Sequence, residues 1–408
     1  MCSVIAVSEL LAVEEALALV LERARPLPSA PVPLDEAVGR VLAEDALAVV
    51  DLPRFPSSAM DGFALRSADT PATLRVVDRI AAGAPSSRSL ARGEAMGIAT
   101  GGVVPEDADA VVPIEQVDDE GERVVVPSAV PVGANVRPRG GDIRAGERVL
   151  SAGTLLSPSR LAALAAAGMA SPVCARRPRV SIVTTGTELR RPGETLAEGE
   201  IYESNGVMLA ALLAQAGAVV EPHERVVDDE ESHRAALARG LEADVLVTSG
   251  GVSMGPHDLV RSTIASLGGE EVFWGVAMRP GKPLSFSVRG ETLVFGLPGN
   301  PVSSYVGAVL FVLPALRALQ GLREPEPRYA AGVLGAPVAR RPRRDDYQRA
   351  RLELQDGVAV LHPIAGQESH MIVRAAAADA LVHIPRGEGE LVAGATVRYL
   401  PLDRLTGA

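Results

Sequence analysis

The spacing of apolar residues changes several times along the chain and predicts several kinds of local structure. Residues 1–50 are expected to be largely helical, because apolar side chains from Leu10 to Leu21 recur at helical spacing after Ser8, a suitable N-cap residue. Residues 51–140 carry short apolar runs separated by glycine and proline, which predicts a β-rich domain. Helical character returns at residues 157–168. Residues 1–50 and 141–175 are therefore expected to form one discontinuous mixed domain, interrupted by the β-rich insertion.

Strand-like and helix-like segments alternate over residues 176–324. This alternation predicts a central three-layer α/β domain with a mainly parallel sheet. Residues 325–408 show short alternating strands without a long helix, which predicts a small C-terminal β-barrel. In the α/β domain the expected strands are 179–185, 218–226, 244–249, 271–278 and 292–297, and the expected helices lie near 204–216, 230–241, 256–267 and 301–319; in the last domain the expected strands are 347–354, 358–363, 381–384 and 396–400.

Composition and charge exclude several classes of function. A formal net charge of −11 disfavours binding to nucleic acid. No apolar run is long enough to span a bilayer and the N-terminal region lacks the features of an export signal, so a cytoplasmic protein is expected. The two cysteines, Cys2 and Cys174, suggest neither a disulfide framework nor a cysteine zinc site.

Three polar or glycine-rich turns follow expected strands of the α/β domain. They contain residues 184–188, 248–253 and 297–301. Ligands of parallel sheets bind beyond the carboxyl ends of strands, where glycines let backbone N–H groups approach an anion. The three turns therefore predict one binding crevice. Its expected substrate-binding residues are Thr185, Ser249, Gly250, Gly251, Pro298, Gly299 and Asn300.

Carboxylates and one unusual cation lie near these turns. Glu188, Asp244 and Asp258 are candidate Mg²⁺ ligands, because Mg²⁺ prefers a few hard oxygen ligands together with phosphate oxygens. Helix capping or loop positioning is the alternative role for Asp258 and Asp244. Lys282 is the one lysine among 40 basic residues and lies in a proline-bounded turn three residues after Arg279, which indicates a site that an arginine fork cannot fill.

Seven motifs together resemble the MoeA family, which includes the E domain of gephyrin. They are residues 58–64, 140–143, 184–189, 202–205, 248–253, 279–283 and 296–303. The resemblance implies an elongated homodimer of four-domain subunits, with an active site between the α/β domain of one subunit and the β insertion of the other. It also implies a Mg²⁺-dependent molybdopterin molybdenumtransferase, which inserts molybdate into adenylylated molybdopterin and releases AMP.

The resemblance also assigns roles to individual residues. Five are expected to be catalytic: Asp61, Asp142, Glu188, Asp258 and Lys282. The acidic residues among them, together with Thr100 and Asp244, match family positions linked to substrate and metal handling. Positions linked to molybdate are matched by Arg279, Lys282, Ser303, Arg349 and Ser369. The chain departs from the family where Thr187 replaces a usual aspartate, where Arg279 replaces a frequent lysine, and after Ser369, where further serines are lacking.

Two other functions remain open at this point. The α/β domain also resembles molybdopterin adenylyltransferase, an enzyme of the preceding step and a possible partner. A gephyrin-like dimeric scaffold is the other alternative, although such a protein would be expected to lose the acidic and cationic residues that this chain keeps.

Overall fold

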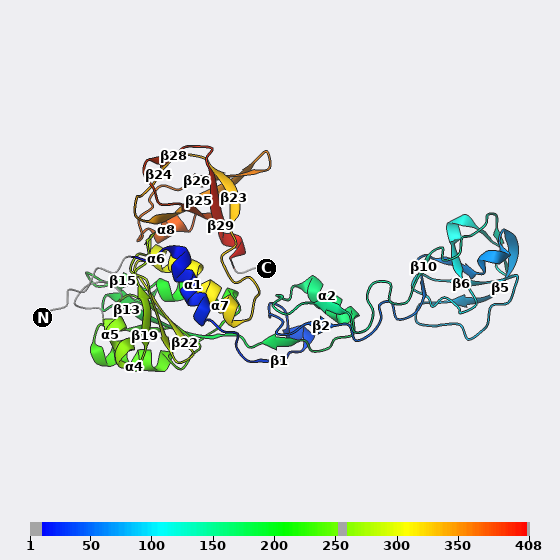
Figure 1. Ribbon diagram of the computed structural model, residues 1–408, viewed down its shortest axis with the longest axis horizontal. Coiled ribbons are helices and arrows are strands. Elements are labelled where there is room, and N and C mark those ends of the chain that lie inside the picture. The colour runs from blue at the N-terminus through cyan, green and yellow to red at the C-terminus, as the bar shows by residue number, and fades with distance from the viewer. Residues whose placement is uncertain (1–9, 252–258, 406–408) are drawn as a thin grey trace.

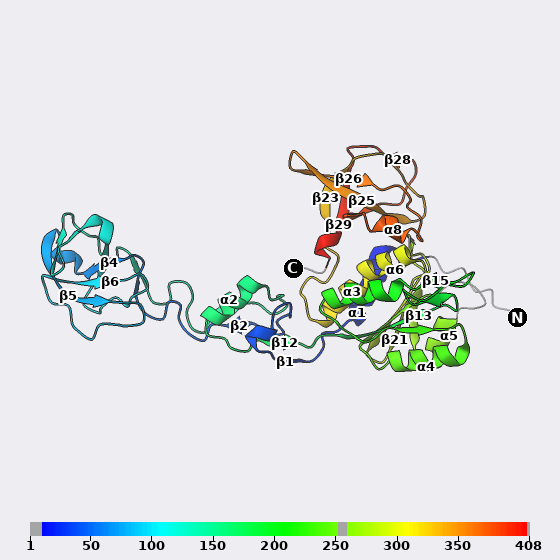
Figure 2. The ribbon, with the colours of Figure 1, turned by 180° about the vertical axis from the view of Figure 1, so that it is seen from behind.

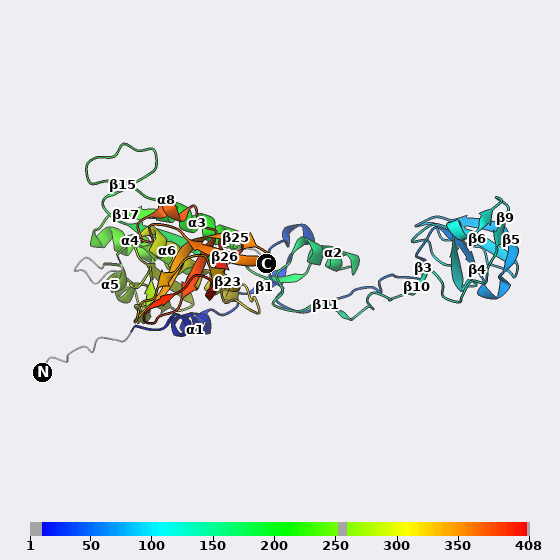
Figure 3. The same cartoon turned by 90° about the horizontal axis from the view of Figure 1, so that it is seen from above.

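The computed structural model describes residues 10–251 and 259–405. The chain is elongated, with a two-domain body at one end and a separate β domain at the far end of a narrow connection (Figures 1 and 2). We call residues 29–175 the arm and the remainder of the described chain the body. The view from above shows the same separation (Figure 3).

The far end of the arm is the β-rich insertion predicted from the sequence. Its six-stranded sheet has the order β7-β4-β6-β5-β9-β8. Alternate residues of β4 enter two small cores: Phe63 and Leu65 lie in one, and Ala64 lies in the other. The strands are β4 (Gly62–Leu65), β5 (Ala72–Ile80), β6 (Glu94–Ile98), β7 (Ala110–Pro113), β8 (Asp118–Asp119) and β9 (Arg123–Val126), with 3-10 helices η2 (Ser67–Asp69) and η3 (Ile114–Gln116).

The root of the arm is built from two separate stretches of sequence, as the sequence predicts. Strand β1 (Ser29–Pro31) pairs with β12 (Val173–Ala175), and β2 (Ala46–Leu47) pairs with β11 (Arg148–Leu150). Helix α2 (Pro158–Ala166) packs in the same small core through Leu164. Farther out β3 (Ser57–Ser58) pairs with β10 (Val136–Arg137), and η1 (Leu34–Glu36) completes the elements of this region.

The first helix departs from the predicted domain boundary. The sequence assigns residues 1–50 to the mixed domain, but α1 (Val13–Arg23) packs on the body, where Val13, Ala16 and Val20 enter the largest core. An amphipathic helix shows which face is buried without showing its partner, so the assignment to the arm was wrong for this segment.

The α/β domain has a mixed sheet of order β16-β13-β18-β22-β21-β19, with β17 beside β13. The strands from β16 to β22 are parallel, while β21 runs antiparallel to both of its neighbours, β22 and β19. The expected strand 271–278 is split at Gly275, which has a φ of +87°, and its last part, β20 (Met278–Arg279), joins the C-terminal sheet. The strands are β13 (Arg179–Thr185), β16 (Val219–Val220), β17 (Glu224–Val226), β18 (Val245–Ser249), β19 (Glu270–Trp274), β21 (Ser285–Arg289) and β22 (Thr292–Leu297), and β14 (Leu189–Arg190) pairs with β15 (Ile201–Tyr202) outside this sheet.

Helices cover both faces of this sheet. Val245 and Val247 of β18 pack with α1, α3 and α7, whereas Leu246 between them packs with α4 and α5. The run Pro301–Leu319 is apolar and long enough to cross a membrane, but 89% of its most apolar window is buried within the protein. The core therefore accounts for its apolar character. The helices are α3 (Asn205–Gln215), α4 (Glu230–Gly240), α5 (Leu259–Ser266), α6 (Pro301–Gly307), a π-helical turn (Ala308–Val312) and α7 (Leu313–Leu319).

The C-terminal domain is a closed five-stranded barrel, which confirms the sequence prediction. Closure follows from the order β25-β26-β23-β29-β27 together with pairing of β27 to β25. Strand β23 was missed by the sequence analysis. The barrel strands are β23 (Ala330–Leu334), β25 (Asp345–Gln355), β26 (Val358–Pro363), β27 (Ala380–Ile384) and β29 (Thr396–Pro401), accompanied by β24 (Val338–Ala339), β28 (Glu390–Leu391), α8 (Ile372–Ala375) and η5 (Leu402–Arg404).

Candidate active site

The structure brings the three glycine-rich turns together at one edge of the α/β sheet. Strands β13, β18 and β22 are neighbours and parallel, so their carboxyl ends meet. Gly250 N donates to Leu297 O at 3.1 Å, which ties the second turn to the third. A methyl group on Gly250 would lie 2.7 Å from Thr185 O and Oγ1, so only glycine allows this approach to the first turn. We call this edge the crevice.

A network of buried polar side chains supports the crevice. Asn205, the first residue of α3, donates through Nδ2 to Ser249 Oγ at 2.9 Å and to Gly299 O at 2.7 Å. Ser249 Oγ also lies 3.2 Å from Pro298 O and from Ser304 Oγ. The sequence analysis placed Asn205 in the motif 202–205 but gave it no role; its position in the first turn of a predicted helix was the available signal.

Several buried oxygens at this edge face no hydrogen-bond partner among the described residues. They belong to the hydroxyl groups of Thr184, Thr185 and Thr248 and to the side-chain carbonyl of Asn205. A buried polar atom without a partner costs roughly 1–3 kcal/mol. Their grouping at the ends of β13 and β18 marks a site suited to a polar ligand.

The predicted carboxylates do not all reach the crevice. Glu188 does, because its carboxylate lies against Gly186 in the first turn. Asp244 precedes β18 and therefore lies at the opposite end of the sheet, where Arg176 holds it through contacts of 2.6 and 2.7 Å. Burial acts to raise the pKa of Asp244, but hydrogen bonds from Arg176 and from Arg179 N outweigh it and the pKa is lowered. This pairing favours the structural role for Asp244, and the structure does not bring it to the candidate metal site.

Asp228 was missed by the sequence analysis. Its Oδ2 accepts from Thr187 N at 3.2 Å and from Thr187 Oγ1 at 3.3 Å, so a second carboxylate lies beside the first turn. Asp258, the third predicted metal ligand, lies outside the described residues. Within the described ranges no group of three or more histidine, cysteine or acidic side chains is placed to hold a metal ion.

The start of α6 joins the crevice to the barrel. Asn300 occupies the N-cap position without a side-chain capping bond, and its Nδ2 donates instead to Ser369 Oγ at 3.0 Å. Val302 N donates to Ser369 O at 3.0 Å. Ser303 is buried on the same first turn, with its carbonyl oxygen beside Gly281. The structure therefore brings Asn300, Ser303 and Ser369 together from two domains.

Arg349 supports the loop that carries Ser369. It is 2% exposed, and its guanidinium donates to the carbonyl oxygens of Gly366, Glu368 and Met371 at 2.9, 3.3 and 3.2 Å. Its Nε donates to Gln367 Oε1 at 3.3 Å. Burial lowers the pKa of Arg349, and Arg279 acts in the same direction. Main-chain carbonyl oxygens occupy the N–H donors of the Arg349 guanidinium. The geometry therefore favours a role for Arg349 in positioning the loop over a direct contact with an anion.

Arg279 and Lys282 present their charges differently. Strand pairing of β20 with β25 places Arg279 opposite Asp346, and Nη1 lies 3.6 Å from Oδ2 of that buried carboxylate. Lys282 is exposed and forms no ion pair with any described residue. Lys282 is therefore the cation of this turn that has its charge available to a ligand.

The arm carries the other predicted site residues. Asp61 Oδ1 accepts from Thr100 N at 2.7 Å and from Thr100 Oγ1 at 3.0 Å. These hydrogen bonds, the backbone one first, lower the pKa of Asp61. Asp142 is exposed on the connection between the arm's root and its far domain. Figure 1 shows that these parts of the chain lie far from the crevice of the same chain.

Comparison with known proteins accounts for nearly the whole chain. Residues 11–168 match the MoeA N-terminal region (domain I and II), residues 181–318 a probable molybdopterin binding domain, and residues 331–402 the MoeA C-terminal region (domain IV). The chain is 36% identical to molybdopterin molybdenumtransferase 2 of Mycobacterium tuberculosis, covering 96% of this chain and 99% of that protein.

Two further relatives agree. Molybdopterin molybdenumtransferase of Staphylococcus aureus is 31% identical, with 94% of each chain covered. The crystal structure of a molybdopterin biosynthesis MoeA protein from Pyrococcus horikoshii superposes with a TM-score of 0.83 at 30% identity, covering 96% of this chain and 99% of that one. Extent, order of domains and identity together show that this chain belongs to the MoeA family.

Proposed function

We propose that this protein is a molybdopterin molybdenumtransferase, which uses molybdate and adenylylated molybdopterin to form molybdenum cofactor and AMP. The observation that carries the proposal is the contact between Asn300 and Ser369, which joins two different kinds of binding surface. The crevice offers N–H groups and hydroxyls suited to phosphate oxygens, and the adjoining barrel side offers a cation and hydroxyls suited to a second oxyanion.

The two surfaces are proposed to bind different substrates. In the crevice, Ser249, Gly250 and Gly299 surround the place where a phosphoanhydride would lie. Cleavage of that bond consumes one water molecule and separates AMP from the pterin phosphate, so these residues need to neutralise charge and position oxygens rather than supply a nucleophile. Lys282, Ser303 and Ser369 would hold molybdate, the second substrate, as a tetrahedral dianion.

Magnesium fits the first turn by its donor chemistry. Glu188 would supply hard oxygens, Asp228 lies beside the same turn, and Mg²⁺ commonly takes most of its remaining ligands from water and phosphates. Asp258 stays a ligand predicted from the sequence. When bound, the ion would neutralise phosphate charge.

We further propose that the site is completed by a second copy of the chain in a homodimer. Asp61, Thr100 and Asp142 lie on the arm, where they cannot meet the crevice of their own chain in this conformation. An antiparallel partner would bring its arm to this body and would receive this arm in return, as an isologous twofold contact requires. We propose that the protein acts in the cytoplasm.

A coupled assay tests the reaction and its main alternative. With Mg²⁺ and adenylylated molybdopterin, AMP release should rise with molybdate concentration, while ATP and free molybdopterin should give no adenylylated product. Adenylylation by this chain alone would assign it to the preceding step, and AMP release that is indifferent to molybdate would overturn the proposal.

A further inference from the structure

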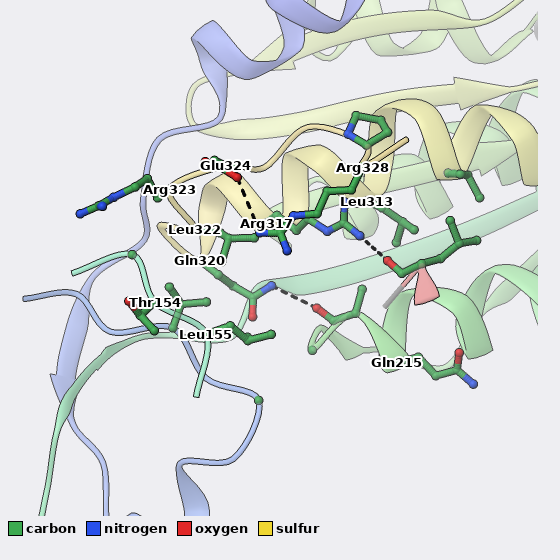
Figure 4. Close-up of a pocket in the computed structure, with 18 of the residues that line it drawn as sticks. Thr154, Leu155, Gln215, Leu313, Arg317, Gln320, Leu322, Arg323, Glu324 and Arg328 are labelled. Atoms are coloured by element: carbon green, nitrogen blue, oxygen red, sulfur yellow. Dashed lines mark hydrogen bonds and ion pairs between the residues drawn. The ribbon is translucent and has the colours of Figure 1, made fainter. Parts of the chain in front are cut away.

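A second concave site lies where the arm, the α/β domain and the barrel meet. It encloses about 730 Å³ and is lined from all three parts, including Leu155 of the arm, Leu313 of α7 and Leu400 of β29. Figure 4 shows Leu155 and Leu313 among the lining side chains. It is separate from the crevice. The crevice lies at the N-terminal ends of α3 and α6, whereas this cavity is lined by residues 214–217, at the C-terminal end of α3, and by the end of α7.

Arginine dominates the charges of the cavity. Its lining contains five arginines and one carboxylate, Glu324, in a chain whose net charge is −11. The C-terminal ends of α3 and α7 each contribute about half a negative charge through the helix dipole, which is too little to offset this excess. The five are Arg160, Arg177, Arg317, Arg323 and Arg328. In Figure 4, Arg323 points away from Arg317 and Arg328.

Arg317 holds a partly buried charge without a carboxylate partner in the described chain. Its guanidinium donates to the carbonyl oxygens of Pro325 and Glu326 at 3.5 and 3.4 Å, and also to that of Leu405. Figure 4 shows Arg328 beside it. Burial first, and then repulsion from Arg328, lower the pKa of Arg317. Arg328 is only weakly compensated, because Glu324 lies 3.9 Å away and both side chains are largely exposed.

The part of the cavity lined by Arg160 of the arm and by Arg177, just beyond the arm, shows the same excess. Arg176 and Arg179 are paired with Asp244 and Glu221, yet Arg177 between them lines the cavity and forms no ion pair among residues that the structure describes. Arg160 donates one hydrogen bond to Leu155 O at 2.6 Å and likewise forms no ion pair with a carboxylate of the described residues. Unpaired guanidinium groups therefore face the cavity from both the arm and the body.

We propose that this cavity binds an organic phosphate of nucleotide size, whose phosphate lies between Arg160 and Arg177 on one side and Arg317 and Arg328 on the other. Guanidinium groups match phosphate oxygens in charge and in fork geometry. The apolar walls at Leu155, Leu313 and Leu400 would receive the organic part, and the volume lies within the usual range for small-molecule sites and far exceeds one phosphate group. This site goes beyond the proposed reaction and shares no residue with the crevice.

Calorimetric titration of the full-length protein with ADP tests this proposal, with inorganic phosphate and adenosine as probes of the two halves of the ligand. Arg328→Ser and Arg177→Ser should each weaken ADP binding by about tenfold or more. Arg351→Ser, which removes an exposed arginine of β25 outside the cavity, should leave it unchanged. Both halves should bind more weakly than ADP.

Hydrogen exchange separates this site from nucleotide binding in the crevice. ADP should protect residues 153–160 and 313–330 in the wild type, and this protection should survive Asn205→Ala but disappear in Arg328→Ser. The proposal is overturned if saturable ADP binding is absent, if ADP protects only the crevice, if inorganic phosphate binds as tightly as ADP, or if the cavity variants bind like Arg351→Ser.

Discussion

The body and the arm both carry predicted site residues, but they hold them differently. In the crevice, Asn205, Ser249 and Ser304 are buried and bound to one another, so the binding groups are fixed before substrate arrives. On the arm, Asp61 is exposed and its carboxylate accepts hydrogen bonds from Thr100. From this contrast we expect the body to bind substrate with its own residues, and we expect Asp61 to act on a surface of the proposed partner copy.

The proposed sharing of sites gives the largest expected effect. Asp61→Ala impairs the arm and Lys282→Ala impairs the body, and each variant alone should lose nearly all molybdate-dependent AMP release. A 1:1 mixture of fully exchanged dimers should regain about a quarter of wild-type activity, because half the dimers are hybrids and each hybrid has one intact site of two.

Subunit exchange must be verified with distinguishable tags on the two variants. A double variant that carries both changes in one chain, mixed with wild type, serves as the control for simple dilution. Hybrid dimers that form and remain inactive would show that arm and body of one chain work together.

A substitution of Lys282 tests how a cation of the body contributes to molybdate binding, independently of the arm. Lys282→Arg keeps the charge but replaces a compact ammonium by a broader fork. The molybdate concentration for half-maximal AMP release should rise about ten- to a hundredfold, since one charged contact to a desolvated anion is weakened. The melting temperature should hardly change, because Lys282 is exposed. Superimposable molybdate titrations for the variant and the wild type would remove Lys282 from the site.

Substitutions of Arg349 distinguish direct binding of molybdate from positioning of the loop 366–371. Arg349→Lys keeps the positive charge but removes the forked guanidinium that binds the loop carbonyls. It should therefore raise the half-saturating molybdate concentration up to about tenfold and speed hydrogen exchange in residues 366–371. Arg349→Met should behave similarly and lower stability by roughly 1–3 kcal/mol. Full rescue by lysine, with unchanged exchange in the loop, would instead indicate direct contact with the anion.

The smallest expected effect concerns the arm. The folded-state pKa of Asp61 is lowered, so its ionised form contributes stability above the unfolded pKa, and this contribution is lost as pH falls through the folded pKa. Thr100→Val removes the hydroxyl donor but keeps the stronger backbone N–H donor. The pKa of Asp61, followed by carboxyl NMR, should therefore rise only slightly, with the acid limb of the activity profile moving the same way. A downward shift, or none, would contradict this assignment of cause.

The sequence predicts the crevice well for a definable reason. The apolar runs 179–185 and 292–297 coincide with β13 and β22, because each ends at a turn rich in glycine or proline. Parallel pairing then places the three turns together without further information. The same reasoning fails for Asp244. It is adjacent to β18 in sequence, but it precedes the strand and so lies at the opposite end of the sheet from the crevice.

Other features depend on partners that a linear pattern does not show. Ala330–Leu334 begins with two alanines and a glycine, which are poor strand formers, so its strand is evident only from pairing with β26 and β29. Asn205 reads as the start of a helix until Ser249 and Gly299 are seen beside it. The arginines of the cavity are scattered over about 170 residues of sequence and converge only in the folded chain.

The packing of α1 on the body sets an order for biosynthesis. Val13, Ala16 and Val20 leave the ribosome early, but the α7 residues that cover them, such as Leu316, are made about 300 residues later. At 5–20 residues per second, the apolar face of α1 waits roughly 15–60 s for its partner. The arm, whose pairings close before residue 176, can fold during that interval. The nascent chain therefore presents a finished distal domain while its first helix still needs protection from aggregation.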